Sequence, residues 1–425
     1  MSTSIERHPE GYLGVFRRNP DFSRLFVGQV VSYCGDWFLT VALLGLVLDL
    51  TGSGTLAALL VVGQTLPSFI LAPYAGTVVD RVDRRRLMIG VNLVAAAMAL
   101  LALFARSSAT LPFAYVAVIG ISCSVAFFSP ASQASIPNVV RDDDLAQANI
   151  LMGATWGTML AVGAALGGLV TATLGRDAAI VIDSLSFIVS AVMLWSIRRP
   201  FQQSRVRKET PFLPALKEAA HYARRRPAVL ALLTSKGGYG ISAGVVALLS
   251  VFAFDVFGTG DIGTGLLYGA RGVGALLGPF LIRRLGGNDA RTFSLIGLGA
   301  VVYGLGYALF AVTPFFALAA TFVLIAHLGG GALWTISSYG LQRLVPDELR
   351  GRIFAADFGL VTLTISISSV VAGVLADAIG PTPTALIMGL LALLWGVVWT
   401  LWTRGVWSPV PEQEGIPSVA GGGRQ

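Results

Sequence analysis

The sequence predicts an all-α integral membrane protein, and composition, apolar runs and charge placement each support this fold class. Hydrophobic residues make up 55% of the 425 residues and charged residues only 12%, whereas soluble domains carry about 25% charged residues. Apolar runs long enough to cross a bilayer as helices, which takes roughly 20 residues, recur along the whole chain. Lys and Arg gather in alternate loops between these runs. Twelve transmembrane helices are therefore expected.

The apolar runs form two sets of six, separated by one long basic segment. The first set is expected near residues 25–50, 55–79, 87–105, 110–129, 147–174 and 178–197. The second set is expected near residues 228–256, 262–282, 292–312, 314–338, 352–378 and 384–403. The predicted parts are an N-terminal six-helix bundle at 1–197, a basic linker at 198–227, a C-terminal six-helix bundle at 228–404 and a disordered cytoplasmic tail at 405–425. The middle of the linker could form a short amphipathic helix on the membrane surface.

Basic residues indicate the orientation of the chain, because Lys and Arg in short loops resist translocation. The loops on one side, together with the termini and the linker, hold almost all of them. The loops on the other side hold only Arg106 and Arg176. We therefore expect a multi-pass protein of the cell inner (plasma) membrane with both termini in the cytoplasm.

Short motifs recur between the two halves at nearly one spacing. Leu48–Gly54 is similar to Phe254–Gly260 at an offset of 206 residues. Gly76–Arg81 has a partial counterpart in Gly278–Arg283 at an offset of 202 residues, with Ile282 in place of the acid. The shared offset predicts two pseudo-symmetric bundles related by an axis along the membrane normal.

The loop after the second span carries six charges in a short turn. Its pattern G-x-x-x-D-R-x-x-R-R is formed by Gly76, Asp80, Arg81, Arg84 and Arg85. Gly76 would allow close approach of helices, and Asp80 could accept hydrogen bonds from a helix N-terminus or an arginine. The simpler alternative is that the positive charge of this loop only keeps it on the cytoplasmic side of the membrane. The pattern resembles the loop 2–3 signature of the major facilitator superfamily, which implies the major facilitator fold and a conformational gate at these residues.

Ionisable residues inside the spans are candidates for function, because they are costly in a bilayer. The proton-coupling candidates are Asp36, Asp183, Asp357 and His327, and the candidate charge partners are Arg271 and Lys236. Asp36 leads, because it stands about 18 Å along the first helix at 1.5 Å per residue, near the midplane, where it could take up and release a proton. Permanent pairing is the alternative for Asp36, and packing is favoured for His327. Arg271 and Lys236 could each pair with Asp36, Asp183 or Asp357, or attract an anionic substrate. Lys236 also stands near enough to the cytoplasmic end for its amine to reach water.

Acidic residues close to the ends of the spans are not candidates for proton coupling. Asp49, Asp255 and Asp377 stand where water reaches them, so we expect them to be ordinary interfacial caps.

The fifth span carries Gly163, Gly167 and Gly168, with Ala164 between them. This stretch resembles the G-P-x-x-G-G element of proton-driven drug exporters. Because alanine replaces the proline, close helix packing is expected without a proline bend. Asn19–Gln29, leading to Asp36, resembles the opening of the macrolide-efflux and enterobactin-exporter-like group of antiporters. That resemblance implies efflux of amphipathic or aromatic compounds from the cytoplasm, coupled to proton entry.

An enzyme is not indicated, since the sequence has no nucleophile elbow, phosphate-binding loop or metal-ligand spacing. We expect no cofactor, no metal and no nucleic-acid partner. The expected partners of this monomer are a small-molecule substrate, protons and membrane lipids. The aromatic residues expected to line a central cavity are Tyr33, Trp37, Phe127 and Trp334. The alternatives to drug or siderophore export are a lipid or lysolipid transporter of the same fold and a transport-dead sensor or scaffold.

Overall fold

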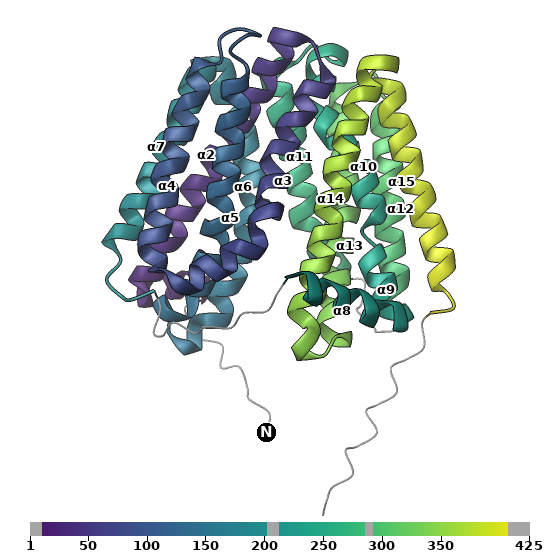
Figure 1. The fold of residues 1–425 in the computed structure, drawn as a ribbon. Helices are drawn as coiled ribbons and strands as arrows, with labels where there is room; N and C mark the ends of the chain where they lie inside the picture. The colour runs from purple at the N-terminus through teal and green to yellow at the C-terminus, as the bar shows by residue number, and fades with distance from the viewer. Residues whose placement is uncertain (1–10, 202–211, 285–291, 407–425) are drawn as a thin grey trace, which may run out of the picture.

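The computed structural model describes residues 11–201, 212–284 and 292–406, and in these residues every regular element is a helix. The first bundle consists of α2 (Pro20–Thr51), α3 (Gly54–Arg81), α4 (Arg84–Leu101), α5 (Pro112–Val139), α6 (Leu145–Leu174) and α7 (Arg176–Ser196). The second consists of α9 (Pro227–Thr234) with α10 (Gly237–Val251), then α11 (Gly260–Arg284), α12 (Thr292–Val312), α13 (Phe316–Leu344), α14 (Asp347–Ile379) and α15 (Pro381–Thr403). The two bundles stand side by side (Figure 1).

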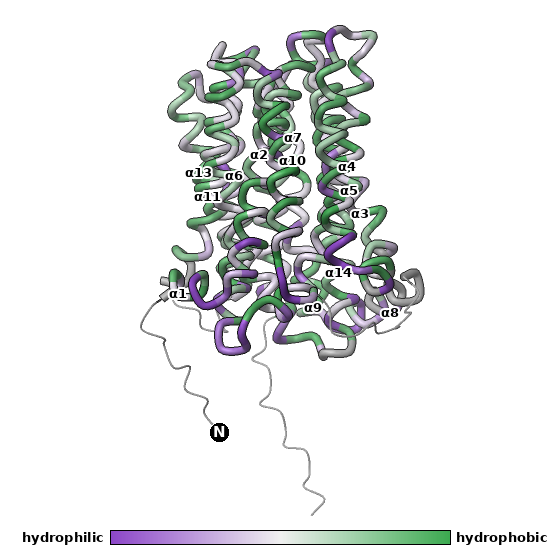
Figure 2. Tube along the Cα trace, turned by 90° about the vertical axis from the view of Figure 1, so that its left-hand side faces the viewer, coloured by the Kyte–Doolittle hydropathy of each residue, from purple (hydrophilic) through white to green (hydrophobic). Residues whose placement is uncertain are grey.

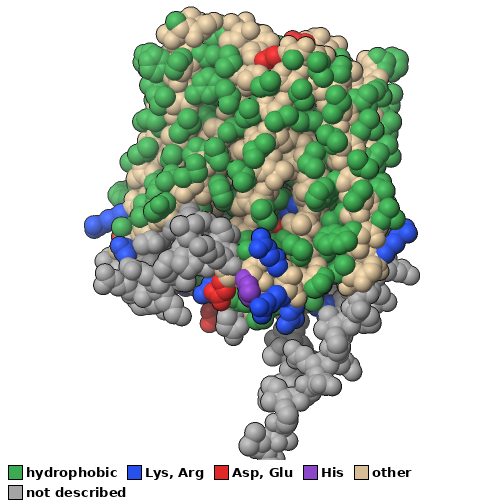
Figure 3. Space-filling view, turned by 45° about the vertical axis from the view of Figure 1, so that its right-hand side comes forward, with side chains coloured by type: hydrophobic (Ala, Val, Ile, Leu, Met, Phe, Trp, Pro, Cys, Tyr) green, Lys and Arg blue, Asp and Glu red, His purple; other side chains and the backbone are tan. Residues whose placement is uncertain are grey.

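The helices form a membrane-spanning body. Eleven of the segments that the structure describes are long and apolar enough to cross a bilayer. Helix α11, with 25 residues, packs between α6 and α13. Hydrophobic side chains cover the flank of the molecule, while basic side chains gather at its lower end (Figure 3). The predicted all-α membrane fold is confirmed.

The two ends of the molecule differ in polarity. The short helices α1 (Gly11–Arg18) and α8 (Phe212–Arg225) lie at the same end, where hydrophilic residues concentrate (Figure 2). We call this the linker end and the opposite end the far end. Helix α8 is the helix expected in the linker. The disordered tail expected at 405–425 lies almost wholly in 407–425, outside the described residues.

Two spans differ from the prediction. Helix α5 continues past residue 129 to Val139, with Pro130 and Pro137 inside it. Membrane helices tolerate proline where neighbours supply other hydrogen bonds, and Arg84 Nη1 donates to the Ala134 carbonyl oxygen between the two prolines at 2.9 Å. The seventh span, expected as one run, is broken between α9 and α10.

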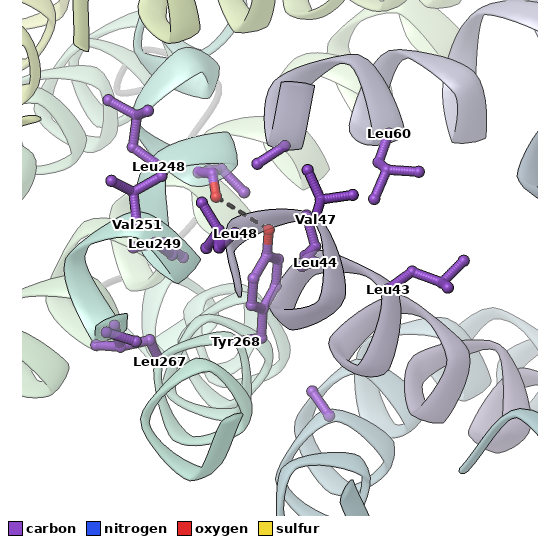
Figure 4. Packing of buried hydrophobic residues seen from close by; sticks show 14 of the residues in the cluster. Leu43, Leu44, Val47, Leu48, Leu60, Leu248, Leu249, Val251, Leu267 and Tyr268 are labelled. Atoms are coloured by element: carbon purple, nitrogen blue, oxygen red, sulfur yellow. Dashed lines mark hydrogen bonds between the residues drawn. The ribbon is translucent and has the colours of Figure 1, made fainter. Parts of the chain in front are cut away.

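The halves share a hydrophobic core at the far end only. Figure 4 shows Leu44 and Val47 of α2 packed near Leu248 and Leu249 of α10, within one cluster that includes residues of both bundles. Toward the linker end each half has its own core. One core is built only from residues between 15 and 201, and the other only from residues between 223 and 399. The halves are therefore sealed together at the far end, while their linker ends pack separately.

Candidate functional site

Two acidic residues meet where α2 packs on α7. Asp183 is completely buried, and a Cβ placed on Gly35 would stand 2.6 Å from its Oδ1 atom. Asp36 follows Gly35 in α2, so both acidic residues lie at the contact between α2 and α7. Asp36 Oδ1 and Asp183 Oδ2 are both buried, and neither accepts a hydrogen bond from the described residues. The structure thus brings two of the predicted residues together as a carboxyl pair.

Arg271 lies among aromatic rings contributed by both halves. Its guanidinium carbon is 6.0 Å from the ring centroid of Trp156 on α6 and 5.9 Å from that of Tyr268 on α11. The Tyr268 ring lies 5.6 Å from Trp37 on α2, and the Tyr239 hydroxyl lies near the guanidinium. Trp156, Tyr268 and Tyr239 were not predicted, because an aromatic residue does not stand out within an apolar run. The position of Tyr268, one helical turn before Arg271, was the available signal.

The predicted cavity residues do not all join this group. Trp37 does so through Tyr268. Tyr33 and Phe127 are half-buried, and among the described residues neither makes a ring contact with the group. Trp334 lies at its edge, 5.7 Å from Tyr239.

His327 belongs to a buried aromatic cluster of the second half. Its Nε2 atom and the Tyr307 hydroxyl are 2.8 Å apart, and the rings of Tyr239 and Tyr303 lie 6.0 and 5.3 Å from its ring. Tyr239 and Tyr303 are stacked at 4.7 Å. This environment fits the packing and hydrogen-bonding role that was favoured for the histidine.

Lys236 forms a buried ion pair with Asp357. It stands at the break between α9 and α10, its side chain is 1% exposed, and it donates a hydrogen bond to Asp357 Oδ2 on α14. Its Nζ atom also lies 4.7 Å from the Trp334 ring centroid. The expectation that the amine reaches water is therefore wrong, because the break in the helix holds the residue inside the second bundle.

The three glycines of the fifth span lie where α6 contacts other helices. A Cβ at Gly163 would be 3.3 Å from Trp37 Cβ, and one at Gly167 would be 3.0 Å from the Trp37 carbonyl oxygen. A Cβ at Gly168 would be 2.7 Å from the Asp261 carbonyl oxygen of α11. Two of these glycines thus let α6 approach α2, and the third lets it approach the other half.

Substitution of Gly168 by alanine is expected to destabilise the protein by about 1–3 kcal/mol, the usual cost of overpacking. The added methyl group would meet the backbones of Asp261 and Gly265, which cannot rotate away. Gly153→Ala on the same helix is the matched control, because a Cβ there has open space within 4 Å. Thermal unfolding followed by size exclusion measures both. Equal stability of the two variants would contradict the assigned packing.

The loop between α3 and α4 is only partly described at the level of side chains. Gly76 is exposed, and a Cβ there would meet nothing within 4 Å, so no close helix approach is present at this glycine. Arg81 is exposed at the end of α3. The side chain of Asp80 lies outside the described part, so its expected hydrogen bonds are not seen.

Other residues of the loop hold it to its own half. The side chain of Asp83, rather than that of Asp80, caps α4 by accepting from a backbone N–H at 2.9 Å. Arg84 donates to the Ala134 carbonyl oxygen of α5 at 2.9 Å. Arg85 donates to the Trp195 carbonyl oxygen of α7. The two predicted arginines thus fix the loop to α5 and α7.

Asp377 joins the halves at the far end. Its carboxylate, on α14, accepts hydrogen bonds from the backbone N–H groups of Gly54 at 2.6 Å and Thr55 at 3.1 Å. It also accepts from the Ser53 hydroxyl at 2.8 Å. Asp377 therefore caps α3 of the opposite half, which the expectation of an ordinary interfacial cap did not include.

Arg176 forms a second far-end link between the halves. Its two terminal nitrogens bind Asp49 of α2 at 2.6 Å and Asp261 of α11 at 3.0 Å. This residue is one of the two basic residues that the sequence placed on the far side. Arg176 and Asp377 therefore add polar contacts between the halves to the shared hydrophobic core at the far end.

Comparisons with known proteins agree with this architecture. A family model described as transmembrane secretion effector (MFS_3) matches residues 15–415. BacE of Bacillus subtilis (strain 168), assigned as a bacilysin exporter, is 26% identical over 380 residues, 88% of this chain and 92% of BacE. Macrolide efflux protein A of Streptococcus pyogenes is 24% identical over 387 residues, 89% of this chain and 94% of that protein.

Solved structures show the same fold. A bacterial homologue of the human lysosomal transporter Spinster, solved in an inward-facing and unoccupied conformation, superposes with a TM-score of 0.73. The match covers 95% of this chain and 100% of the other at 14% identity.

Proposed function

This chain belongs to the transmembrane secretion effector family of major facilitator transporters, and from that premise we propose that it exports small amphipathic molecules from the cytoplasm in exchange for protons. As a member of this family it is a membrane transporter and not an enzyme. Export as the direction is supported by the relatives, of which one is assigned as a bacilysin exporter and another is a macrolide efflux protein.

The observation that carries the proposal is the unequal packing of the two ends. One core spans both halves at the far end, whereas two separate cores lie at the linker end. In the proposal the linker end faces the cytoplasm, so this conformation receives cargo from inside. Rocking of the halves would then break the far-end links and close the linker end.

Proton coupling is assigned to the carboxyl pair of Asp36 and Asp183. Asp36 Oδ1 and Asp183 Oδ2 are inaccessible to water and have no hydrogen-bond partner among the described residues. Ionisable groups inside a membrane protein that lack a partner are candidates for reversible proton binding. Neither residue is in an ion pair with a described Lys or Arg, which leaves the pair free to respond to protons. Asp36 lies next to Trp37, which contacts Tyr268 of the other half, so its protonation state is placed to affect the contact between the halves.

The loop carrying Asp80 and Arg81 is assigned the role of gate. In the proposal these residues clasp the linker ends of the two halves in the outward-facing state. Asp80→Asn would weaken this clasp and shift the population inward.

Replacement of Asp36 by asparagine is expected to abolish proton-driven efflux while the protein still reaches the membrane, because the amide cannot bind the coupled proton. Efflux of neutral, anionic and cationic amphipathic dyes from cells measures this, with and without a protonophore. Asp177→Asn is the control, since Asp177 is 55% exposed and pairs with Arg106 at the far end.

Wild-type efflux that continues in the presence of the protonophore would contradict proton coupling. Uncoupled transport of lipids or drugs would then be the better explanation. If none of the dyes is transported, a transport-dead sensor or scaffold would be favoured over an exporter.

A further inference from the structure

The geometry points to a cargo that carries an anionic group, such as a carboxylate, bound by Arg271, with its apolar part packed on Trp156, Tyr268 and Trp37. This inference rests on the proposed export function and adds to it the chemical class of the cargo. The three rings come from α6, α11 and α2, so a ligand in this position touches both halves of the transporter.

Arg271 lacks the counter-charge that Lys236 and Arg176 have. Lys236 pairs with Asp357, and Arg176 pairs with two carboxylates at the far end. Within the part of the chain that the structure describes, no carboxylate oxygen lies within 4.0 Å of Arg271. An unpaired cation within a membrane-spanning helix is costly, and an anionic ligand would supply the missing charge.

The donors of Arg271 are also not all used. Its Nε atom is buried and has no hydrogen-bond partner among the described residues. The guanidinium is held by the faces of Trp156 and Tyr268, at 6.0 and 5.9 Å. Cation–π contacts of this kind fix the position of the guanidinium and leave the Nε–H donor without a partner among the described residues. A planar fork of N–H donors matches the two oxygens of a carboxylate.

The rings around Arg271 indicate the chemistry of the rest of the ligand. Tyr268 lies 5.6 Å from Trp37, and its hydroxyl is already bonded to the Val246 carbonyl oxygen at 3.0 Å. Tyr268 is itself only 3% exposed, so its ring supports Trp37 and the Arg271 guanidinium, whereas Trp156 is 51% exposed and has an accessible ring. An aromatic or aliphatic group beside the anionic group would pack against these rings. The site thus fits an amphipathic carboxylate better than a neutral or cationic drug.

The main competing explanation is that Arg271 pairs with the carboxyl group of Asp36 when the halves move. The two residues stand on helices that contact each other through Trp37 and Tyr268, but no ion pair joins them in this conformation. In that case Arg271 would serve conformational change, and the charge of the cargo would not matter for binding.

The test compares binding of two probes that differ only in this group, N-dansyl-phenylalanine and its carboxamide. Purified full-length protein in lipid nanodiscs is titrated with each probe, and energy transfer from tryptophan to dansyl reports occupancy. We expect the acid to bind at least about tenfold more tightly than the amide, as hydrogen bonds to a charged group provide. Arg271→Gln should remove the preference, Arg271→Lys should retain part of it, and Arg106→Gln, an exposed control at the far end, should leave it unchanged.

Equal affinity of the wild type for acid and amide, or binding of neither, would overturn the inference. So would a preference for the acid that survives in Arg271→Gln. The wild-type comparison needs no variant, so it holds even where Arg271→Gln does not fold. Dye efflux from cells tests the export function separately: efflux together with equal probe affinities would keep export and reject an anionic cargo.

Discussion

Replacement of Asp357 by asparagine is expected to destabilise the protein by about 3–5 kcal/mol, the usual cost of breaking a buried ion pair. Lys236 is 1% exposed and Asp357 4% exposed, so the ammonium group left behind cannot reach water without opening the second bundle. The Trp334 ring 4.7 Å away would offset only a small part of this cost. The variant should show a clearly lower midpoint of thermal unfolding and a lower yield of monodisperse protein.

A double-mutant cycle separates the interaction energy of the Lys236–Asp357 pair from the cost of each substitution by itself. The cycle compares Lys236→Met, Asp357→Leu and the double variant. The double variant removes both charges and should be more stable than either single variant, because neither partner is left unpaired. Asp177→Asn removes one member of the exposed pair with Arg106, whose side chains are 55% and 61% exposed, and should cost only about 0–1 kcal/mol. Losses that simply add in the double variant would contradict the buried pair.

Substitution of Asp377 by alanine is expected to shift the protein toward the state that is open at the far end. Its carboxylate accepts from two backbone N–H groups and the Ser53 hydroxyl of the opposite half. These bonds must break when the halves separate there. Their loss should destabilise the present conformation by about 1–3 kcal/mol, which changes the ratio of the two states by roughly 5- to 150-fold.

Distances between spin labels at the far ends of α3 and α14 measure this shift. The wild type should show mainly the short distance and Asp377→Ala a larger share of a longer one. Asp255→Ala is the control, because Asp255 is exposed near the far end and has no hydrogen bond or ion pair with the described residues. An unchanged distance distribution in Asp377→Ala would show that the cap does not hold the closed far end.

The spanning helices could be predicted from hydropathy, because the bilayer imposes the same length and polarity on each of them. Local departures from regular spanning helices could not be predicted from hydropathy. The break at Lys236 accompanies an ion pair with a residue 121 positions away, and α5 continues past Pro130 although proline lacks the N–H of a helical hydrogen bond.

The candidate site was only partly visible in the sequence. Charged residues inside apolar runs are conspicuous, so Asp36, Asp183 and Arg271 were identified. Their grouping was not predictable, because it is set by which helix faces pack together. Asp377 shows the same limit, since its sequence position indicates a cap while only the packing of α14 against α3 shows that it caps the other half.

The central claim is that uptake of a proton at Asp36 drives movement of the cargo. The most direct measurement uses purified protein in liposomes with an acidic interior, in which accumulation of an exported dye and the internal pH are followed together. The account predicts gradient-driven accumulation with loss of internal protons for the wild type and Asp177→Asn, and neither signal for Asp36→Asn. Accumulation by Asp36→Asn at the wild-type rate, or wild-type accumulation without a gradient, would contradict it.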